Sequence, residues 1–366
     1  MTDTGLVLDS PQTRWPQTHW DLKDLLPEPS EEVLGAEIRA LEAATSAFEQ
    51  RRGELAAGMA PEAFLDIVRQ FEALLAAMIR VEAYGQLWFS SDTQSSDALT
   101  FRNRVEQLTT GLTNRVLFLE VWWKELSDED AERLLPASPE HADYRRYLLD
   151  LRRLRPYRLD EAREQLINLK DADGIGGLVT LYSMLTNRLE YHLEVDGETK
   201  TLTRDGLMTY AYSGDPAVRA AAYRELYRVY GDEATVLRQI YTYRVRDWHN
   251  ENQLLRGFET PIAVRNTRND IPDEAVDTML EVIRDHRGLF QRFFRLKAGW
   301  MGLERLRRYD IYAPLKESDR EISWHAGLEL VLGTFHDFHP RLGQLAERVF
   351  REGHIDSEVR KGKRGG

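Results

Sequence analysis

Hydrophobic residues recur along most of the chain at spacings of three and four, which is the pattern of amphipathic helices. The stretch PEAFLDIVRQFEALLAAMIRV shows this clearly, and Pro61 suits the first turn of the predicted helix. The stretch SSDTQSSD interrupts the pattern, and Asp97 is predicted to cap a second helix. A further helix is predicted to begin near Ser127. The two apolar stripes predicted to pack together are Phe64, Ile67, Val68, Phe71, Leu74, Leu75 and Met78, and Phe101, Val105, Leu108, Leu112, Val116 and Leu119.

One segment alternates with period two instead. In RLEYHLEVDGETKTLT, apolar side chains occupy every second position up to Val195, and Asp196-Gly197 is typical of a type I′ turn. A two-residue loop fixes the register and places Tyr191 opposite Leu202. These patterns together predict a mainly α fold, a multi-helix bundle with one small β-hairpin near 188–204.

The second half of the chain predicts more helices. One is expected to start at Asp215-Pro216 and to pack through a stripe of tyrosines and Leu226. A long helix is predicted from Asp273 to about Leu303, with His286 hydrogen-bonded inside the core. The predicted inward residues are Tyr223, Leu226, Tyr227 and Tyr230 in the first helix, and Val276, Met279, Leu280, Ile283, Phe290, Phe293 and Phe294 in the second.

Two short stretches are predicted to lie between helices. DGIGG, at 173–177, is glycine-rich but lacks the spacing of a dinucleotide or phosphate loop and is expected to be a plain loop. YDIYAPL, at 309–315, is expected to be an extended structural segment that ends at Pro314.

Composition narrows the class of protein. The 366 residues carry a net charge of −12, which argues against nucleic acid or an anionic membrane as a partner. The absence of cysteine excludes disulfides, thiol nucleophiles and cysteine-bound metals. The first residues lack a basic region followed by an apolar run, and no stretch approaches the length of a membrane-spanning helix. These features predict a cytoplasmic location.

The histidines offer little metal chemistry. A helical zinc peptidase needs two histidines four residues apart, with a glutamate beside the first as general base. The only close pair, His336 and His339, has a spacing of three, and Pro340 follows directly, so the pair is expected to lie where a helix ends. The tyrosine- and arginine-rich stretch from Tyr223 to Trp248 holds five arginines against four acids. It is therefore interpreted as a packing face and not as a single-strand binding surface.

Several stretches nevertheless resemble one family, in the same order along the chain. They are HWDLKDLLPEPSEE, AYGQLWFSSDTQSSDA, LRRLRPYRLDEAREQLINLK, LEVDGETKTLT with YSGDPAVRAAAYRELY, IPDEAVDTMLEVI with RFFRLKAGWMGLERLRRYDIYAPL, and HIDSEVRKGKRGG. The first resembles the family's WDLSDLYP segment. Together they are similar to bacterial oligoendopeptidase F, of the thimet-oligopeptidase-like zinc metallopeptidases, over nearly all of Trp20 to Gly366.

The resemblance implies a domain plan: a flexible tail at 1–18, a helical N-terminal domain at 19–204, and the first, incomplete part of a helical peptidase domain at 205–366. It also implies that KGKRGG leads into a strand along the active-site groove, with Gly365 and Gly366 as substrate-binding positions, because glycine permits close backbone approach. The alternative, a basic tail that binds anions, is disfavoured because it has only four cations in an acidic chain.

The family's chemistry requires zinc held by a His-Glu-x-x-His helix and a further glutamate, and residues 1–366 contain no such motif. No catalytic or metal-binding residue carries over, so this chain by itself is expected to be inactive. Two functions stay open. The chain is the front portion of a zinc endopeptidase that cleaves short peptides in a deep channel, or it is a non-catalytic helical peptide-binding or interaction protein. The oligomeric state stays open as well.

Overall fold

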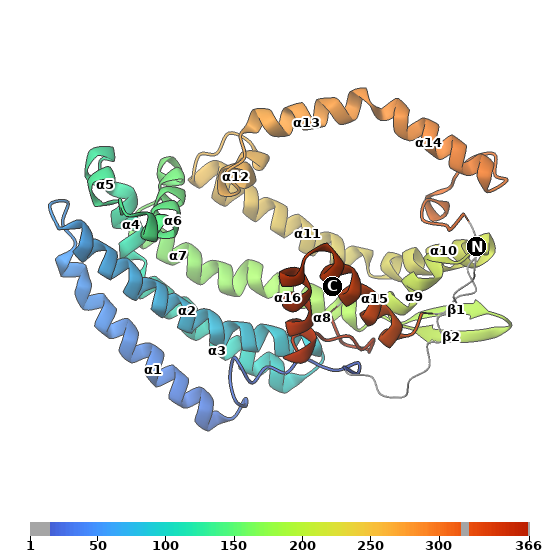
Figure 1. Ribbon diagram of the computed structural model, residues 1–366, viewed down its shortest axis with the longest axis horizontal. Helices are drawn as coiled ribbons and strands as arrows, with labels where there is room; N and C mark the ends of the chain where they lie inside the picture. Colours follow the sequence, from blue (N-terminus) through green and yellow to red (C-terminus); the bar gives the residue numbers. More distant parts are fainter. Residues whose placement is uncertain (1–14, 316–321, 365–366) are drawn as a thin grey trace.

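The computed structural model describes residues 15–315 and 322–364 and has the predicted mainly helical fold with one two-stranded sheet (Figure 1). The predicted tail at 1–18 lies mostly outside the described residues. The first half of the chain contains α1 (Glu31–Gln50), α2 (Pro61–Ser91), α3 (Ser96–Val116), α4 (Phe118–Glu125), α5 (Asp128–Leu134), α6 (Ala142–Arg153), α7 (Glu161–Asp171) and α8 (Gly177–Asn187).

The main hydrophobic core lies among α1 to α6 and confirms the predicted packing of α2 on α3. Phe64 of α2 stacks on Trp123 of α4, with ring centroids 5.0 Å apart, and both side chains are fully buried. The indole nitrogen of Trp123 donates to the carbonyl oxygen of Leu148 at 2.8 Å, so this large side chain is buried without losing its hydrogen bond.

The helix starts depend on short polar side chains, with one difference from the prediction. Ser95, and not Asp97, caps α3, because its hydroxyl accepts from the backbone nitrogen of Ala98 at 3.2 Å. Asp97 lies inside the first turn, where a negative charge still favours the helix dipole. Ser127 caps α5 as predicted.

The β-hairpin forms as predicted, from β1 (Tyr191–Val195) and β2 (Glu198–Leu202), with Tyr191 opposite Leu202. Asp196 and Gly197 both have positive φ, 55° and 79°, as a type I′ turn requires. Tyr191 and Leu193 face a second, smaller core against the following helices.

The hairpin is followed by α9 (Arg204–Thr209), α10 (Pro216–Asp232), α11 (Ala234–Trp248) and α12 (Pro261–Arg268). The prediction of a loop at DGIGG is wrong. Ala172–Gly176 form a π-helical segment, η4, that joins α7 to α8 without a break, and a second π-helical segment, η6 (His249–Leu255), follows α11. Glycine costs helix stability but does not forbid the helix where both flanks already enforce it.

The predicted long helix from Asp273 is two helices, α13 (Asp273–Asp285) and α14 (Arg287–Trp300), which join at His286. Their apolar side chains do not point into a core: most of the predicted inward residues are exposed, and His286 is exposed as well. The ring nitrogen Nδ1 of His286 lies 2.8 Å from the carbonyl oxygen of Val282, at the break between the helices. In Figure 1 the two helices lie along one edge of the molecule.

Two other expectations need correction. Tyr227 is exposed and its ring contacts that of the neighbouring Tyr223, whereas Leu226 and Tyr230 pack on the second core as predicted, together with Ala222 and Val229. The stretch 309–315 is not extended: it includes the short 3₁₀ turn η7 (Arg308–Asp310), which ends in a fully buried aspartate. The last helices are α15 (Trp324–Phe338) and α16 (Pro340–Arg351), which pack against each other.

A buried ion pair holds η7 on α10. Arg219 and Asp310 are each 1% exposed at the side chain, and Nη2 of Arg219 lies 2.9 Å from Oδ1 of Asp310. The other guanidinium nitrogen, Nη1, donates to the carbonyl oxygens of Ser213 and Gly214 at 2.7 and 2.8 Å. Arg219 of α10 therefore bonds to two turns of the chain, the one at Ser213–Gly214 and η7.

Replacing Asp310 by asparagine should lower the free energy of unfolding by about 3 kcal/mol, because it leaves the guanidinium of Arg219 buried without a counter-charge. The measurement is urea unfolding. The control is Asp232→Asn, which removes an exposed partner of Arg228 and should cost less than about 1 kcal/mol. Equal decreases in the free energy of unfolding for the two variants would contradict a stabilising role for the buried Arg219–Asp310 pair.

Candidate functional site

The carboxyl-terminal segment, residues 353–364, returns to the turn between α2 and α3. The carbonyl oxygen of Gly362 accepts from the backbone nitrogen of Thr93 at 2.8 Å and from its hydroxyl at 2.7 Å. The backbone nitrogen of Arg364 donates to the carbonyl oxygen of Ser90 at 2.8 Å. Gly362 has φ of 85°, and a Cβ there would lie 2.6 Å from Oδ1 of Asp92, so only glycine fits this docking point.

The buried side chain of Asp356 binds two cations of this segment. Its side chain is 0% exposed; Arg360 donates two hydrogen bonds to its oxygens at 2.7 and 2.6 Å, and Nζ of Lys363 lies 3.1 Å away. Burial alone would raise the pKa of Asp356, but the hydrogen bonds from Arg360 and Lys363 lower it below its ordinary value. The aspartate is therefore held as a carboxylate by two cations of its own segment.

The cations of the terminal basic run are mostly engaged within the protein. Arg360 also donates to the carbonyl oxygen of Ser91 at 2.8 Å, and Lys361 pairs with Glu190 at 2.6 Å. This pairing explains why the run does not form a free basic tail. The predicted substrate positions Gly365 and Gly366 lie outside the described residues, so their role stays a prediction.

A polar cavity of about 230 Å³ lies directly beside this segment. Its walls come from the end of α8, the start of α9, Tyr230 of α10, residues 358–360, Lys363 and Arg364. Nδ2 of Asn187, which faces this region from the last turn of α8, is buried and has no hydrogen-bond partner among the described residues. The docked segment thus borders a space that can take polar atoms.

The amino-terminal strap, residues 15–24, runs along the other side of the segment. The backbone nitrogen of Asp21 donates to the carbonyl oxygen of Gly353 at 2.9 Å, and that of Ser357 donates to the carbonyl oxygen of Thr18 at 3.1 Å. His19 pairs with Glu358 at 3.0 Å. Residues more than 300 positions apart in the chain are therefore joined at this point.

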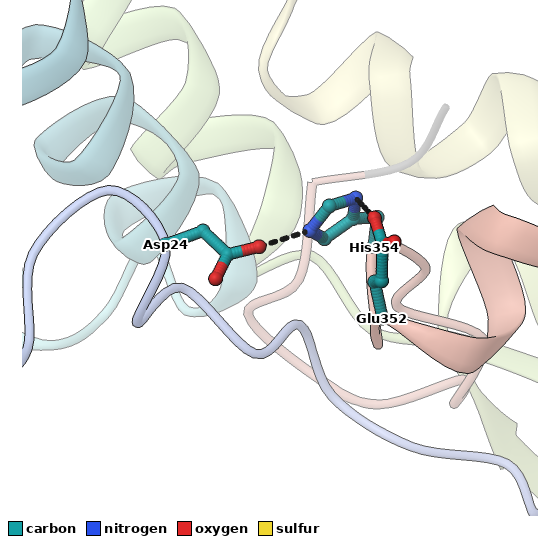
Figure 2. Close-up of side chains that lie close together, drawn as sticks. All are labelled: Asp24, Glu352 and His354. Carbon is teal, nitrogen blue, oxygen red and sulfur yellow. Dashed lines mark hydrogen bonds and ion pairs between the residues drawn. The ribbon is translucent and has the colours of Figure 1, made fainter.

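His354 lies between two carboxylates in the same region (Figure 2). Its Nε2 is 3.1 Å from Oδ2 of Asp24, and its Nδ1 is 3.7 Å from Oε2 of Glu352. The three side chains each offer one ligand atom within 4.8 Å of the others, but His354 uses its two ring nitrogens on two different carboxylates, and exposed acidic groups of this kind are common without an ion. The arrangement instead acts as a contact between the strap and the end of α16.

His336 and His339 do not converge on a common point. α15 ends at Phe338, as the position of Pro340 predicted, and Nδ1 of His339 accepts from the backbone nitrogen of Arg341 at 3.2 Å to cap α16. His336 faces Glu347 of α16 at 3.9 Å. Both histidines therefore serve the junction of α15 and α16.

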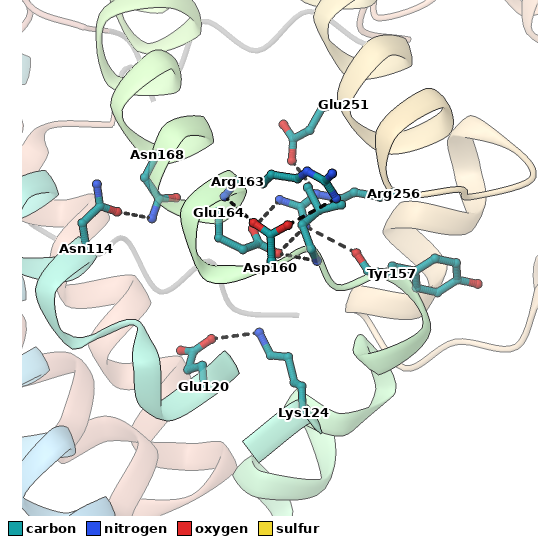
Figure 3. A network of polar contacts seen from close by, with 11 residues as sticks. Asn114, Glu120, Lys124, Tyr157, Asp160, Arg163, Glu164, Asn168, Glu251 and Arg256 are labelled. Carbon is teal, nitrogen blue, oxygen red and sulfur yellow. Dashed lines mark hydrogen bonds and ion pairs between the residues drawn. The ribbon is translucent and has the colours of Figure 1, made fainter. Parts of the chain in front are cut away.

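A second polar network joins α7 to η6 (Figure 3). Arg256 donates to both carboxylate oxygens of Glu164 at 2.8 Å and to Glu251 at 2.8 Å. Beside it, Asp171 at the end of α7 and Asp247 of α11 approach Glu251 closely. Burial, then the charges of Glu251 and Asp247, raise the pKa of Asp171 to about 6, although Arg256 opposes this.

Sequence reasoning missed Asp356 and Arg256. Asp356 is four residues before Arg360, but that spacing signals an ion pair only within a helix, and this segment is not helical. Arg256 was one of many arginines, and nothing in the pattern distinguished it from an exposed one. Arg256 pairs with Glu164, 92 residues away, whereas the partners of Asp356 lie within its own irregular segment.

The comparisons with known proteins agree on one family. A family model described as "Oligopeptidase F" matches residues 122–191, and one described as "Peptidase family M3" matches residues 209–366. The chain is 24% identical over 311 residues to group B oligopeptidase PepB of Streptococcus agalactiae, covering 83% of this chain and 50% of the relative. It is 19% identical over 351 residues to oligopeptidase PepF of Bacillus subtilis, covering 95% of this chain and 52% of the relative.

The crystal structure of oligoendopeptidase-F from Enterococcus faecium superposes with a TM-score of 0.71 at 19% identity, covering 92% of this chain and 69% of that one. The architecture is therefore the helical peptidase fold. The chain belongs to peptidase family M3, in its oligopeptidase F branch. It spans about half the length of the curated relatives it matches. Over the described residues, no helix is both long enough and apolar enough to cross a membrane.

Replacing Asp171 by asparagine should stabilise the protein at neutral pH. The pKa of Asp171 is about 6 in the folded state and about 3.9 unfolded, so the native state binds more protons between those values. Stability is therefore lost as pH rises from about 4 to about 6, and the variant avoids this loss. We expect a gain of about 1 kcal/mol at pH 7.5, reduced from the full shift by solvent screening, and none at pH 4.

Urea unfolding at the two pH values measures the difference. The control is Asp173→Asn, an exposed aspartate two residues away, which should change stability little at either pH. A gain for Asp171→Asn that is equal at pH 4 and pH 7.5 would show that its charge is not the cause.

Proposed function

We propose that this chain forms the helical wall of a zinc-dependent endopeptidase that cleaves short, unfolded peptides in a channel. The observation that carries the proposal is a set of apolar helix faces exposed in a chain that matches only half of its relatives. Family membership and the helical peptidase fold support the same proposal. The names of the relatives, which are oligopeptidases, indicate the substrate class.

The exposed apolar surface comprises large side chains of α13 to α16. Phe290 and Phe293 of α14 are 52% and 51% exposed, and Phe338 at the end of α15 is 81% exposed. Others on these helices are Met279, Leu280, Val282, Ile283, Leu289, Leu296, Leu330 and Val331. A surface of this kind is costly in water unless another body covers it.

The covering body that we propose is the metal-bearing half of the peptidase, which the relatives' additional length would supply. In relatives of this family that half carries the His-Glu-x-x-His helix implied by the sequence resemblance. The apolar faces of α13 to α16 would pack against it and form part of the channel wall. The chain's own contribution would be to shape the channel, to exclude folded proteins and to position the segment at 353–364.

The residues described here do not fit a zinc centre. His354 uses its two ring nitrogens on two different carboxylates, His336 and His339 serve a helix junction, and the cluster at Asp171 contains only carboxylates. Zinc in such enzymes prefers histidine with a carboxylate and an open position for water. We therefore assign no step of the reaction to a metal held by this chain.

The exposed faces should bind a hydrophobic dye. Changing Phe290 and Phe293 to serine should lower the fluorescence of bound dye at least twofold, because it removes two aromatic side chains from the proposed interface. The free energy of unfolding should change by less than about 0.5 kcal/mol, since neither side chain is in a core. Leu166→Ser, which changes a 59% exposed residue of α7, is the matched control and should leave dye binding unchanged.

The 366-residue chain with added zinc should not cleave a quenched fluorescent peptide, but it should bind the peptide. Zinc-dependent cleavage that disappears when His336 and His339 are changed to alanine would contradict the proposal, because it would place a working metal site in this chain. Saturable peptide binding together with weak dye binding would favour the alternative, a non-catalytic peptide-binding protein with a covered surface.

A further inference from the structure

We infer that Asp356 is a positioning residue for the peptide-binding groove: it fixes the segment 356–364 in the one conformation that docks Gly362 on Thr93 and directs the backbone at Arg364 along the polar cavity. The inference rests on the proposed function for its peptide role. Its structural part stands on contacts of described residues alone. Asp356 touches no proposed substrate, so it would act through the segment that it holds.

The first step is the closed charge arrangement within the segment. The side chain of Asp356 is fully buried, and Arg360 and Lys363 both contact it across a stretch with no helix or strand. Nζ of Lys363 also donates to the backbone carbonyl oxygens of Asp356 and Glu358, at 2.7 and 2.9 Å. The carboxylate and two carbonyls thus replace the hydrogen bonds that regular secondary structure would supply.

The second step is the attachment of this arrangement to a rigid support. Arg360 bridges Asp356 to the carbonyl oxygen of Ser91, and Thr93 is 0% exposed where it donates twice to Gly362. The turn between α2 and α3 belongs to the helices of the main core. The end of the segment is therefore held by helices of the main hydrophobic core.

The third step is the direction in which the held segment runs beside the cavity. The backbone nitrogen of Arg364 is already bonded to Ser90, and residues 358–360, Lys363 and Arg364 form one wall of the 230 Å³ cavity. The backbone N–H and C=O groups of this segment that are not already hydrogen-bonded can pair with an extended peptide. Because the segment is already fixed, such binding would cost no further conformational entropy in it. Loss of the Asp356 charge would leave the cations of the segment without a common partner and release this wall.

The test uses the full 366-residue chain and two variants that act by different routes. Asp356→Asn removes the charge, and Thr93→Val removes the hydroxyl bond to Gly362 with little change in shape. Lys361→Ala is the matched control, because Lys361 belongs to the same segment but forms its ion pair with the exposed Glu190. Hydrogen exchange of the Thr93 and Arg364 amides reports on the docking, and fluorescence anisotropy with a labelled, unstructured decapeptide reports on binding.

We expect exchange of both amides to become at least tenfold faster in Asp356→Asn and Thr93→Val, with peptide affinity about tenfold weaker. The urea midpoint should fall more in Asp356→Asn, which leaves two cations without their buried partner, than in Thr93→Val. Lys361→Ala should match the wild type. Unchanged amide exchange in both variants would overturn the inference. Faster exchange with unchanged peptide affinity would overturn the groove role and leave the proposed function standing. A wild-type chain that binds no peptide would contradict the proposed function, while amide exchange would still decide the docking.

Discussion

The need of each amphipathic helix to bury its apolar face is the constraint on which this structure depends. α2 and α3 meet that need inside one core, where Phe64 and Trp123 stack with both rings fully buried. α13 and α14 have an apolar stripe of the same period, and most of it is not buried by any part of the chain that the structure describes. The same physical rule therefore explains both the stable part of the molecule and the surface that we propose to be an interface.

Charged side chains have a different role, because they fix where distant segments lie. The Arg219–Asp310 pair holds a 3₁₀ turn on α10, Arg256 joins α7 to a π-helical segment, and Asp356 holds the carboxyl-terminal segment in a closed form. Each of these groups would be costly to bury alone, so each is paired and hydrogen-bonded. Such pairs add specificity of position more than net stability.

The location of these pairs bears on function. Asp356 and the amino-terminal strap meet at the same segment, so the two ends of the described chain are held together beside one polar cavity. In a peptidase of this family, a wall that is preorganised in this way would let a peptide bind without a large ordering cost. The fold thus connects the packing of α2 and α3 to the shape of the proposed groove.

The sequence by itself determined those elements that depend on residues close together along the chain. Asp196-Gly197 set the hairpin register, Pro61 and Ser127 marked helix starts, and the stripe of α2 identified its buried face, because each depends on neighbours along the chain. The order of the quoted motifs also determined the family. The N-cap of α3 could not be assigned from periodicity, because the side chains of Ser95 and Asp97 can both accept a hydrogen bond from the first backbone N–H groups of a helix.

Only the tertiary structure decided the rest. Periodicity shows which face of a helix is apolar but not whether another part of the protein packs on that face. The exposure of Phe290 and Phe293 could therefore not be predicted from the sequence pattern. The flanking helices made a π-helical segment of DGIGG, against its own propensity. The role of Asp356 depended on the chain returning to Thr93 across more than 250 residues. Contacts of that range arise from folding back, and no local pattern encodes them.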